Sequence, residues 1–205
     1  MRNPAFNPWL SMWKQPRETV RAYVLNHSAK WLWMLSALSG IKFFLDNADA
    51  QDVGDQVAFG SILLLSLIIG PFLGIIYWYL LSGLLAITGK VAGLSGKWRE
   101  FRQAVGLSFV PLAWAMPLWL IRLILFGSEN FASRTPVIDS SVWLLLLIVL
   151  FSLVDLALGV WYLVTLSRSV AEVYDCSAWK AFGLILLSGL VFSLLLTLLL
   201  LPLVN

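Results

Sequence analysis

Long apolar runs separated by short polar connections fill residues 30–205 of the chain. A helix needs about 20 apolar residues to cross the hydrocarbon core of a bilayer. Five runs meet or approach this length, at about 30–46, 57–88, 104–126, 141–166 and 180–203. The pattern therefore predicts an all-α, polytopic membrane protein with five transmembrane helices.

The second run, 57–88, is longer than one span requires. As one helix it would measure about 48 Å, which exceeds a core of about 30 Å and requires tilt, bending or projection. Proline removes a backbone hydrogen bond and clashes with the preceding turn, so we expect a kink at Gly70-Pro71. Gly70 and Gly74 also have the spacing of small residues that lets two helices approach closely.

The basic residues of the polar segments alternate along the chain. In chain order, the six segments hold five, zero, four, one, two and zero Lys and Arg residues. Segments on the cytoplasmic side of a membrane carry the excess of Lys and Arg. The alternation therefore supports five spans, including the short first one, and places the N-terminus in the cytoplasm and the C-terminus outside.

Residues 1–29 form a basic and aromatic segment before the first span. Pro16 suits the first position of a helix, and Val20 and Tyr23 lie on one face of that helix. Two further pairs are spaced four residues apart, namely Trp9 with Trp13 and Arg17 with Arg21. Aromatic residues toward lipid and arginines toward anionic headgroups describe a cytoplasmic, amphipathic interfacial helix. A docking surface for a partner and an irregular lead segment are the alternatives.

The connection of residues 89–103 is basic and rich in glycine. Its cations include Lys97, Arg99 and Arg102. Neither Gly-Lys pair is followed by Ser or Thr, so the phosphate-binding loop of nucleotide-binding proteins is absent. We expect a cytoplasmic turn that contacts lipid headgroups or a protein partner, and no nucleotide.

Three ionisable residues lie inside the predicted spans: Asp155, Lys42 and Arg122. Charges in a bilayer are costly and so indicate function or specific pairing. Lys42 can pair with Asp155, which lies at a similar depth, or with Asp46 four residues further on. Arg122 lies near the outer end of its span, where we expect it to extend toward the interface. Asp155 is consistent with an interhelical hydrogen bond, and alternatively with a proton or cation path.

Composition excludes several classes of protein. The chain is 60% hydrophobic and 12% charged, whereas soluble domains are about half apolar and about a quarter charged. The single cysteine, Cys176, and the single histidine, His27, argue against an internal disulfide, a Cys/His zinc site and histidine-based catalysis. The net charge of +3 gives no dense basic face for nucleic acid. We therefore predict no catalytic residue, no metal ligand, no cofactor and no nucleic-acid partner.

Four stretches of the sequence resemble the Yip family of Ypt/Rab-interacting membrane proteins in its bacterial branch. They are NPWLSMWKQPRETVR, GPFLGIIYWYLLSGLLAITGKVAG, AVGLSFVPL and SVAEVYDCSAWKAF. The resemblance implies a bacterial cytoplasmic (inner) membrane, with a cytoplasmic N-terminus and a periplasmic C-terminus. Eukaryotic members bind Rab GTPases, but this chain lacks their long acidic cytoplasmic region, so that role is not carried over.

The sequence thus predicts a cytoplasmic lead segment, 1–29, and a five-helix Yip-like membrane domain, 30–205. We expect a non-enzymatic membrane-organising or adaptor protein that contacts anionic lipids and either a second copy of itself or another membrane protein. The alternative is a small transporter or lipid-handling protein that uses Asp155 and a broken second helix.

Overall fold

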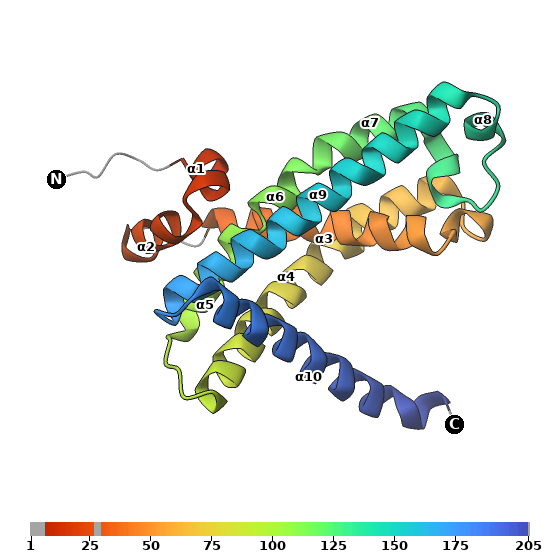
Figure 1. Ribbon diagram of the computed structural model, residues 1–205. Coiled ribbons are helices and arrows are strands. Elements are labelled where there is room, and N and C mark those ends of the chain that lie inside the picture. Colours follow the sequence, from red (N-terminus) through yellow and green to blue (C-terminus); the bar gives the residue numbers. More distant parts are fainter. Residues whose placement is uncertain (1–6, 27–29, 205) are drawn as a thin grey trace. The chain divides into compact units, whose positions relative to one another are not determined.

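The computed structural model describes residues 7–26 and 30–204, and the regular elements in these ranges are all helical (Figure 1). Residues 1–6, 27–29 and 205 of the predicted segments lie outside the described residues. The α-helices are α1 Pro8–Lys14, α2 Pro16–Asn26, α3 Lys30–Ala50, α4 Phe59–Val91, α5 Trp98–Ser108, α6 Val110–Trp114, α7 Met116–Phe126, α8 Pro136–Asp139, α9 Val142–Val173 and α10 Ala178–Val204. Two 3₁₀ helices, η1 Val53–Asp55 and η2 Gly127–Phe131, lie in the connections. The predicted all-α class is confirmed.

Three helical runs among the described residues are long and apolar enough to cross a membrane. They are Phe59–Val91, Trp98–Phe131 and Val142–Val173, and they correspond to the second, third and fourth predicted spans. The other two predicted spans correspond to α3 and α10. That the chain crosses the membrane five times stays a prediction.

The third predicted span is divided, and it begins earlier than expected. It consists of α5, α6 and α7, with interruptions close before Pro111 and Pro117. A proline lacks the N–H group that a continuous helix would use there. The helix α5 also replaces part of the polar turn predicted at 89–103. Its apolar residues Phe101, Ala104 and Val105 recur three and four positions apart and are buried.

The second predicted span is one continuous α-helix, α4, which runs through Pro71 without interruption. The broken second helix expected for a transporter is therefore not present. Whether the axis of α4 bends at Gly70-Pro71 stays a prediction.

The chain forms two compact units. Unit 1 contains Met1–Ala29, Trp78–Ser108 and Leu163–Asn205, and unit 2 contains Lys30–Tyr77 and Phe109–Tyr162. The long helices α4 and α9 each contribute residues to both units.

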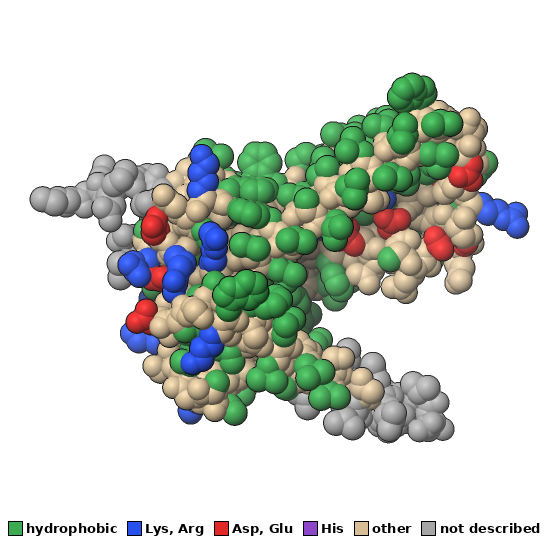
Figure 2. All heavy atoms as spheres, viewed as in Figure 1, with side chains coloured by type: hydrophobic (Ala, Val, Ile, Leu, Met, Phe, Trp, Pro, Cys, Tyr) green, Lys and Arg blue, Asp and Glu red, His purple; other side chains and the backbone are tan. Residues whose placement is uncertain are grey.

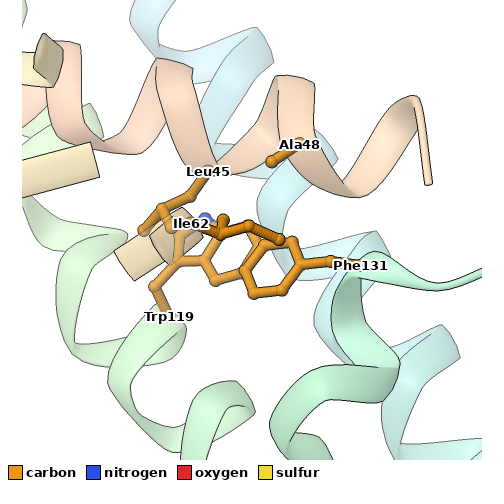
Figure 3. Close-up of a cluster of buried hydrophobic side chains, with 5 residues drawn as sticks. All are labelled: Leu45, Ala48, Ile62, Trp119 and Phe131. Atoms are coloured by element: carbon orange, nitrogen blue, oxygen red, sulfur yellow. The ribbon is translucent and has the colours of Figure 1, made fainter. Parts of the chain in front are cut away.

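An apolar cluster joins α3, α4, α7 and η2 within unit 2 (Figure 3). Its buried members are Leu45, Ala48, Ile62, Trp119 and Phe131. The rings of Trp119 and Phe131 are stacked, with centroids 5.8 Å apart. A second group of aromatic rings lies within the same unit, where Phe109 contacts both Tyr77 and Tyr162 at centroid distances of 6.1 and 6.0 Å. Ring contacts of this kind add to the stabilisation from apolar burial.

The N-terminal helices are packed into unit 1. Helices α1 and α2 both contact α5, and Met12, Val20 and Tyr23 are buried. We expected the aromatic residues of this segment to face lipid, and for Tyr23, which shares its face with Val20, that expectation is wrong. The reason is the amphipathic helix α5, whose apolar face gives α2 a protein surface to cover.

Candidate functional site

Arg17 of α2 binds the C-terminal end of α9. Its Nη2 donates to the carbonyl oxygens of Ala171, at 3.2 Å, and Cys176, at 2.7 Å. The last carbonyl groups of a helix have no partner within the helix, and a cation is favourable beside them. Arg17 therefore attaches the N-terminal segment to the last turn of α9 and to the connection that follows it, through hydrogen bonds to their backbone.

Glu172 joins both arginines of α2. Its carboxylate lies 2.6 Å from Nε of Arg21 and 3.4 Å from Nε of Arg17, and its side chain is only 12% exposed. The hydrogen bond and the charge of Glu172 raise the pKa of the Arg21 guanidinium above its usual value. Sequence reasoning missed Glu172 as the partner, although an acid in the last turn of a long helix opposes the helix dipole and indicates a nearby cation.

Trp9 and Trp13 of α1 are both half-buried in unit 1. Interfacial contact by these rings and by the two arginines of α2 stays a prediction.

The cations of α5 differ in their surroundings. Lys97 and Arg99 are exposed, and Lys97 has Glu100 at 3.9 Å. Arg102 is half-buried against α4, where its Nη1 donates to the hydroxyl of Tyr79 at 3.1 Å and its Cζ lies 5.4 Å from the centre of that ring. A guanidinium at this distance from an aromatic ring makes a cation–π contact.

Tryptophan side chains fix α5 along α4. The indole N–H of Trp78 donates to the carbonyl of Arg102 at 2.6 Å. The ring of Trp98 lies against Gly83, where an added Cβ would come within 2.8 Å of it. Sequence reasoning missed Tyr79, Trp78 and Gly83 as neighbours of the basic connection, because they are distant from it in the sequence.

Charge is divided unevenly between the two units. The sequence of unit 1 holds ten Lys and Arg against four Asp and Glu, and that of unit 2 holds four against seven. Figure 2 shows most of the visible cationic side chains around α2, α5 and the start of α10, further cationic atoms beside α8, and apolar side chains covering much of α9 and α7. Unit 1 is thus the basic part of the molecule.

Lys42 is the centre of an ion-pair network in unit 2. Its Nζ lies 2.7 Å from Asp46 and 2.9 Å from Asp155, and its side chain is 7% exposed. Both alternatives that the sequence left open are therefore present together. One ammonium has three N–H donors, which is enough to serve two carboxylates.

Arg122 extends the network toward η2. It is buried, and its Nη2 donates to Asp49 at 2.8 Å while its Nε donates to Asn130 at 3.2 Å. It also stacks over Trp119, whose indole N–H donates to Asp46 at 2.9 Å. Arg122 therefore pairs within the protein where we expected it to extend outward, and Asp49, Trp119 and Asn130 are partners that the sequence did not reveal.

The arrangement of this network fits a structural role, in which the charged side chains hold helices together. Both oxygens of Asp46 accept hydrogen bonds, from Lys42 and from Trp119. Asp155 accepts one from Lys42 at Oδ2, and its Oδ1 lies 2.9 Å from the same ammonium. Among the described residues there is no cluster of three side chains suited to a metal ion. The network joins α3, α7, α9 and η2 by charge and hydrogen bonds.

A close helix contact involves the small residues of α4. An added Cβ at Gly74 would lie 1.9 Å from the carbonyl oxygen of Ser36, and one at Gly40 would lie 2.0 Å from that of Gly70. Pro71, beside this contact, is half-buried. The partners Ser36 and Gly40 were missed, although they show the same spacing of small residues as Gly70 and Gly74.

Comparison with known proteins identifies the family of the chain. The family model of the Yip1 domain matches residues 10–200, which include both units almost completely. No curated protein matches the chain, and no solved structure does. The family model and the apolar helices together establish that the chain is a membrane protein of the Yip family.

Proposed function

We propose that this protein is a non-enzymatic membrane-organising or adaptor protein of a bacterial cytoplasmic membrane. Unit 1 would lie at the cytoplasmic face and contact anionic headgroups and a protein partner. The observation that carries the proposal is the concentration of cations in unit 1, with ten Lys and Arg against four acidic residues.

The proposed topology has five spans, with the N-terminus in the cytoplasm and the C-terminus in the periplasm. The unit 2 portions of α3, α4 and α9 have 21, 19 and 21 residues. At about 1.5 Å per residue these portions are about 30 Å long, which is the thickness of the hydrocarbon core. Helices α3 and α10 supply the first and fifth spans in this proposal.

The exposed side chains of unit 1 suit a membrane surface. Lys97, Arg99 and Lys180 are exposed, and so are the rings of Trp98 and Trp179. Tryptophan favours the boundary between lipid and water, and each cation near an anionic leaflet contributes about 1 kcal/mol of binding free energy. A surface of this kind favours anionic lipids. The helices of unit 1 could in addition contact a second copy of the protein or another membrane protein.

The test is the lipid composition around the protein when it is extracted together with its native membrane in polymer-bounded discs. We expect anionic lipids to be enriched relative to the bulk membrane and the enrichment to fall in Arg99→Glu. The matched control is Arg134→Glu, which reverses an exposed arginine of unit 2 and should leave the enrichment unchanged. The absence of any anionic enrichment around the unaltered protein would contradict the proposal.

A further inference from the structure

Arg102 differs from the other shielded cations of the protein. Among the described residues, four Lys or Arg side chains are buried or half-buried, namely Arg17, Lys42, Arg102 and Arg122. Three of them have a carboxylate within 4.0 Å, whereas Arg102 has none among the described residues. Its Nε is buried without a hydrogen-bond partner in the described structure, as is that of Arg17, but Arg17 has Glu172 at 3.4 Å. A half-buried charge with no carboxylate beside it is poorly compensated, so the site favours an anion from outside the chain.

Neighbouring side chains prepare Arg102 for such an anion. Arg99 and Trp98 precede it by three and four positions on α5, so the three side chains lie on one side of the helix. The hydroxyl of Tyr79 accepts a hydrogen bond from Nη1 and so orients the guanidinium. A guanidinium presents a planar fork of N–H donors that matches the oxygens of a phosphate.

An exposed apolar row lies on α4 beside this cluster. Leu80, Ile87 and Val91 are 44%, 63% and 84% exposed. Their spacing of seven and four residues places them along one side of the helix. Gly83, which Trp98 covers, lies three residues after Leu80 and four before Ile87, so the row runs beside the Trp98 ring.

We propose that Arg102 is the centre of a binding site for an anionic glycerophospholipid. The phosphodiester would be held by Arg102 and Arg99, and an acyl chain would lie along Leu80, Ile87 and Val91. The inference rests on the proposed headgroup-binding function and names the site at which one lipid is held specifically. The joint presence of an uncompensated guanidinium and an apolar row selects a lipid over a soluble phosphate.

The test is lipid binding to the full-length protein by native mass spectrometry in detergent. Phosphatidylglycerol is titrated against the unaltered protein, Arg102→Gln and Arg168→Gln. Arg168 is an exposed arginine of unit 1 on α9, so its replacement removes the same charge at another position. Loss of a charge-assisted hydrogen bond should weaken retention of the first lipid about tenfold in Arg102→Gln, and leave it unchanged in Arg168→Gln.

The outcomes separate the site from the broader proposal. Equal weakening by both variants would show general attraction to the basic unit and overturn the Arg102 site, but would leave the proposed function intact. No preference for phosphatidylglycerol over phosphatidylcholine in the unaltered protein would overturn both. Displacement of the lipid by millimolar inorganic phosphate would overturn the lipid as the ligand.

If Arg102→Gln does not fold, Arg102→Lys takes its place, since it keeps the charge without the planar fork of N–H donors. If Arg102→Lys retains phosphatidylglycerol as strongly as the unaltered protein does, the Arg102 site is overturned.

Discussion

At the scale of single residues, Gly74 allows the backbones of α3 and α4 to touch. We predict that Gly74→Ala destabilises the fold by about 2 kcal/mol, as is usual when a packed interior is overfilled. The cause is the added Cβ, which would lie 1.9 Å from the carbonyl oxygen of Ser36 and 2.8 Å from the backbone nitrogen of Gly40.

The measurement is the unfolding temperature of each Gly74 and Gly60 variant in the same detergent. Gly60→Ala is the control, because a Cβ at Gly60 of the same helix meets nothing within 4 Å. Equal unfolding temperatures for the two variants would show that α3 and α4 do not meet in this way.

Asp55 makes the stability of one connection depend on pH. Its carboxylate accepts hydrogen bonds from the side chain and backbone of Ser133, and these hold its pKa below the usual value. Because the pKa is lower in the folded state, the contact stabilises the protein above the unfolded pKa of about 3.9. This stabilisation is lost as the pH falls through the folded pKa.

We therefore predict that Asp55→Asn lowers the unfolding temperature near pH 6, and that the difference from the unaltered protein shrinks as the pH falls below about 4. The measurement is the unfolding temperature across this range. The control is Asp52→Asn, which removes an exposed carboxylate from the same connection. A constant difference between Asp55→Asn and the unaltered protein at every pH would contradict the role of the Asp55–Ser133 contact.

At the scale of elements, Lys42 links α3 to α9 and serves two carboxylates at once. We predict that Lys42→Met destabilises the protein by about 3 kcal/mol, because it leaves Asp46 and Asp155 without their cation. Asp155→Asn should cost about 1 kcal/mol, since Asp46 still pairs with Lys42 and the amide can accept a hydrogen bond. Chemical unfolding of both variants measures the difference. A larger cost for Asp155→Asn than for Lys42→Met would indicate that Asp155 has a further role.

The attachment of α2 to the end of α9 is a second prediction at this scale. Arg17→Gln removes the charge that binds two carbonyls and Glu172, so we expect the amides of α2 to exchange with solvent about tenfold faster. Arg21→Gln should have a smaller effect, because Arg21 is more exposed and contacts only Glu172 among these groups. Hydrogen exchange of peptides from α2 measures both. Unchanged exchange in Arg17→Gln would mean that apolar burial alone holds α2 in place.

Long apolar runs were enough to predict the long helices of this chain, but not all of its helices and not their packing partners. The runs that became α4 and α9 are long and uniformly apolar, so their existence followed from length and hydropathy. The first half of α5 was missed because Lys97, Arg99 and Arg102 made its segment look like a polar turn, whereas residues from 104 on lay in the third predicted span. The contacts of Arg17 with Glu172 and of Gly74 with Ser36 join residues that are distant in the sequence. Such pairs are set by tertiary packing, which local patterns do not specify.

At the scale of the whole molecule, the two units carry charge of opposite sign. The positive-inside rule predicts that the basic segments lie in the cytoplasm, where we propose that the anionic lipids of that leaflet attract them. Within unit 2, apolar side chains of α4, α7 and α9 are exposed where a bilayer would cover them. The central claim is therefore that the basic connections of unit 1 lie on the cytoplasmic side.

The single cysteine allows this claim to be tested directly. Cys176 lies between α9 and α10 in unit 1, and burial raises the pKa of its thiol, so labelling is best done at about pH 8. A membrane-impermeant maleimide is applied to spheroplasts and to opened membranes. We predict that Cys176 reacts only in opened membranes, and that Arg134→Cys in a Cys176→Ser background reacts in intact spheroplasts. Labelling of Cys176 in intact spheroplasts would place unit 1 outside the cytoplasm and contradict the account.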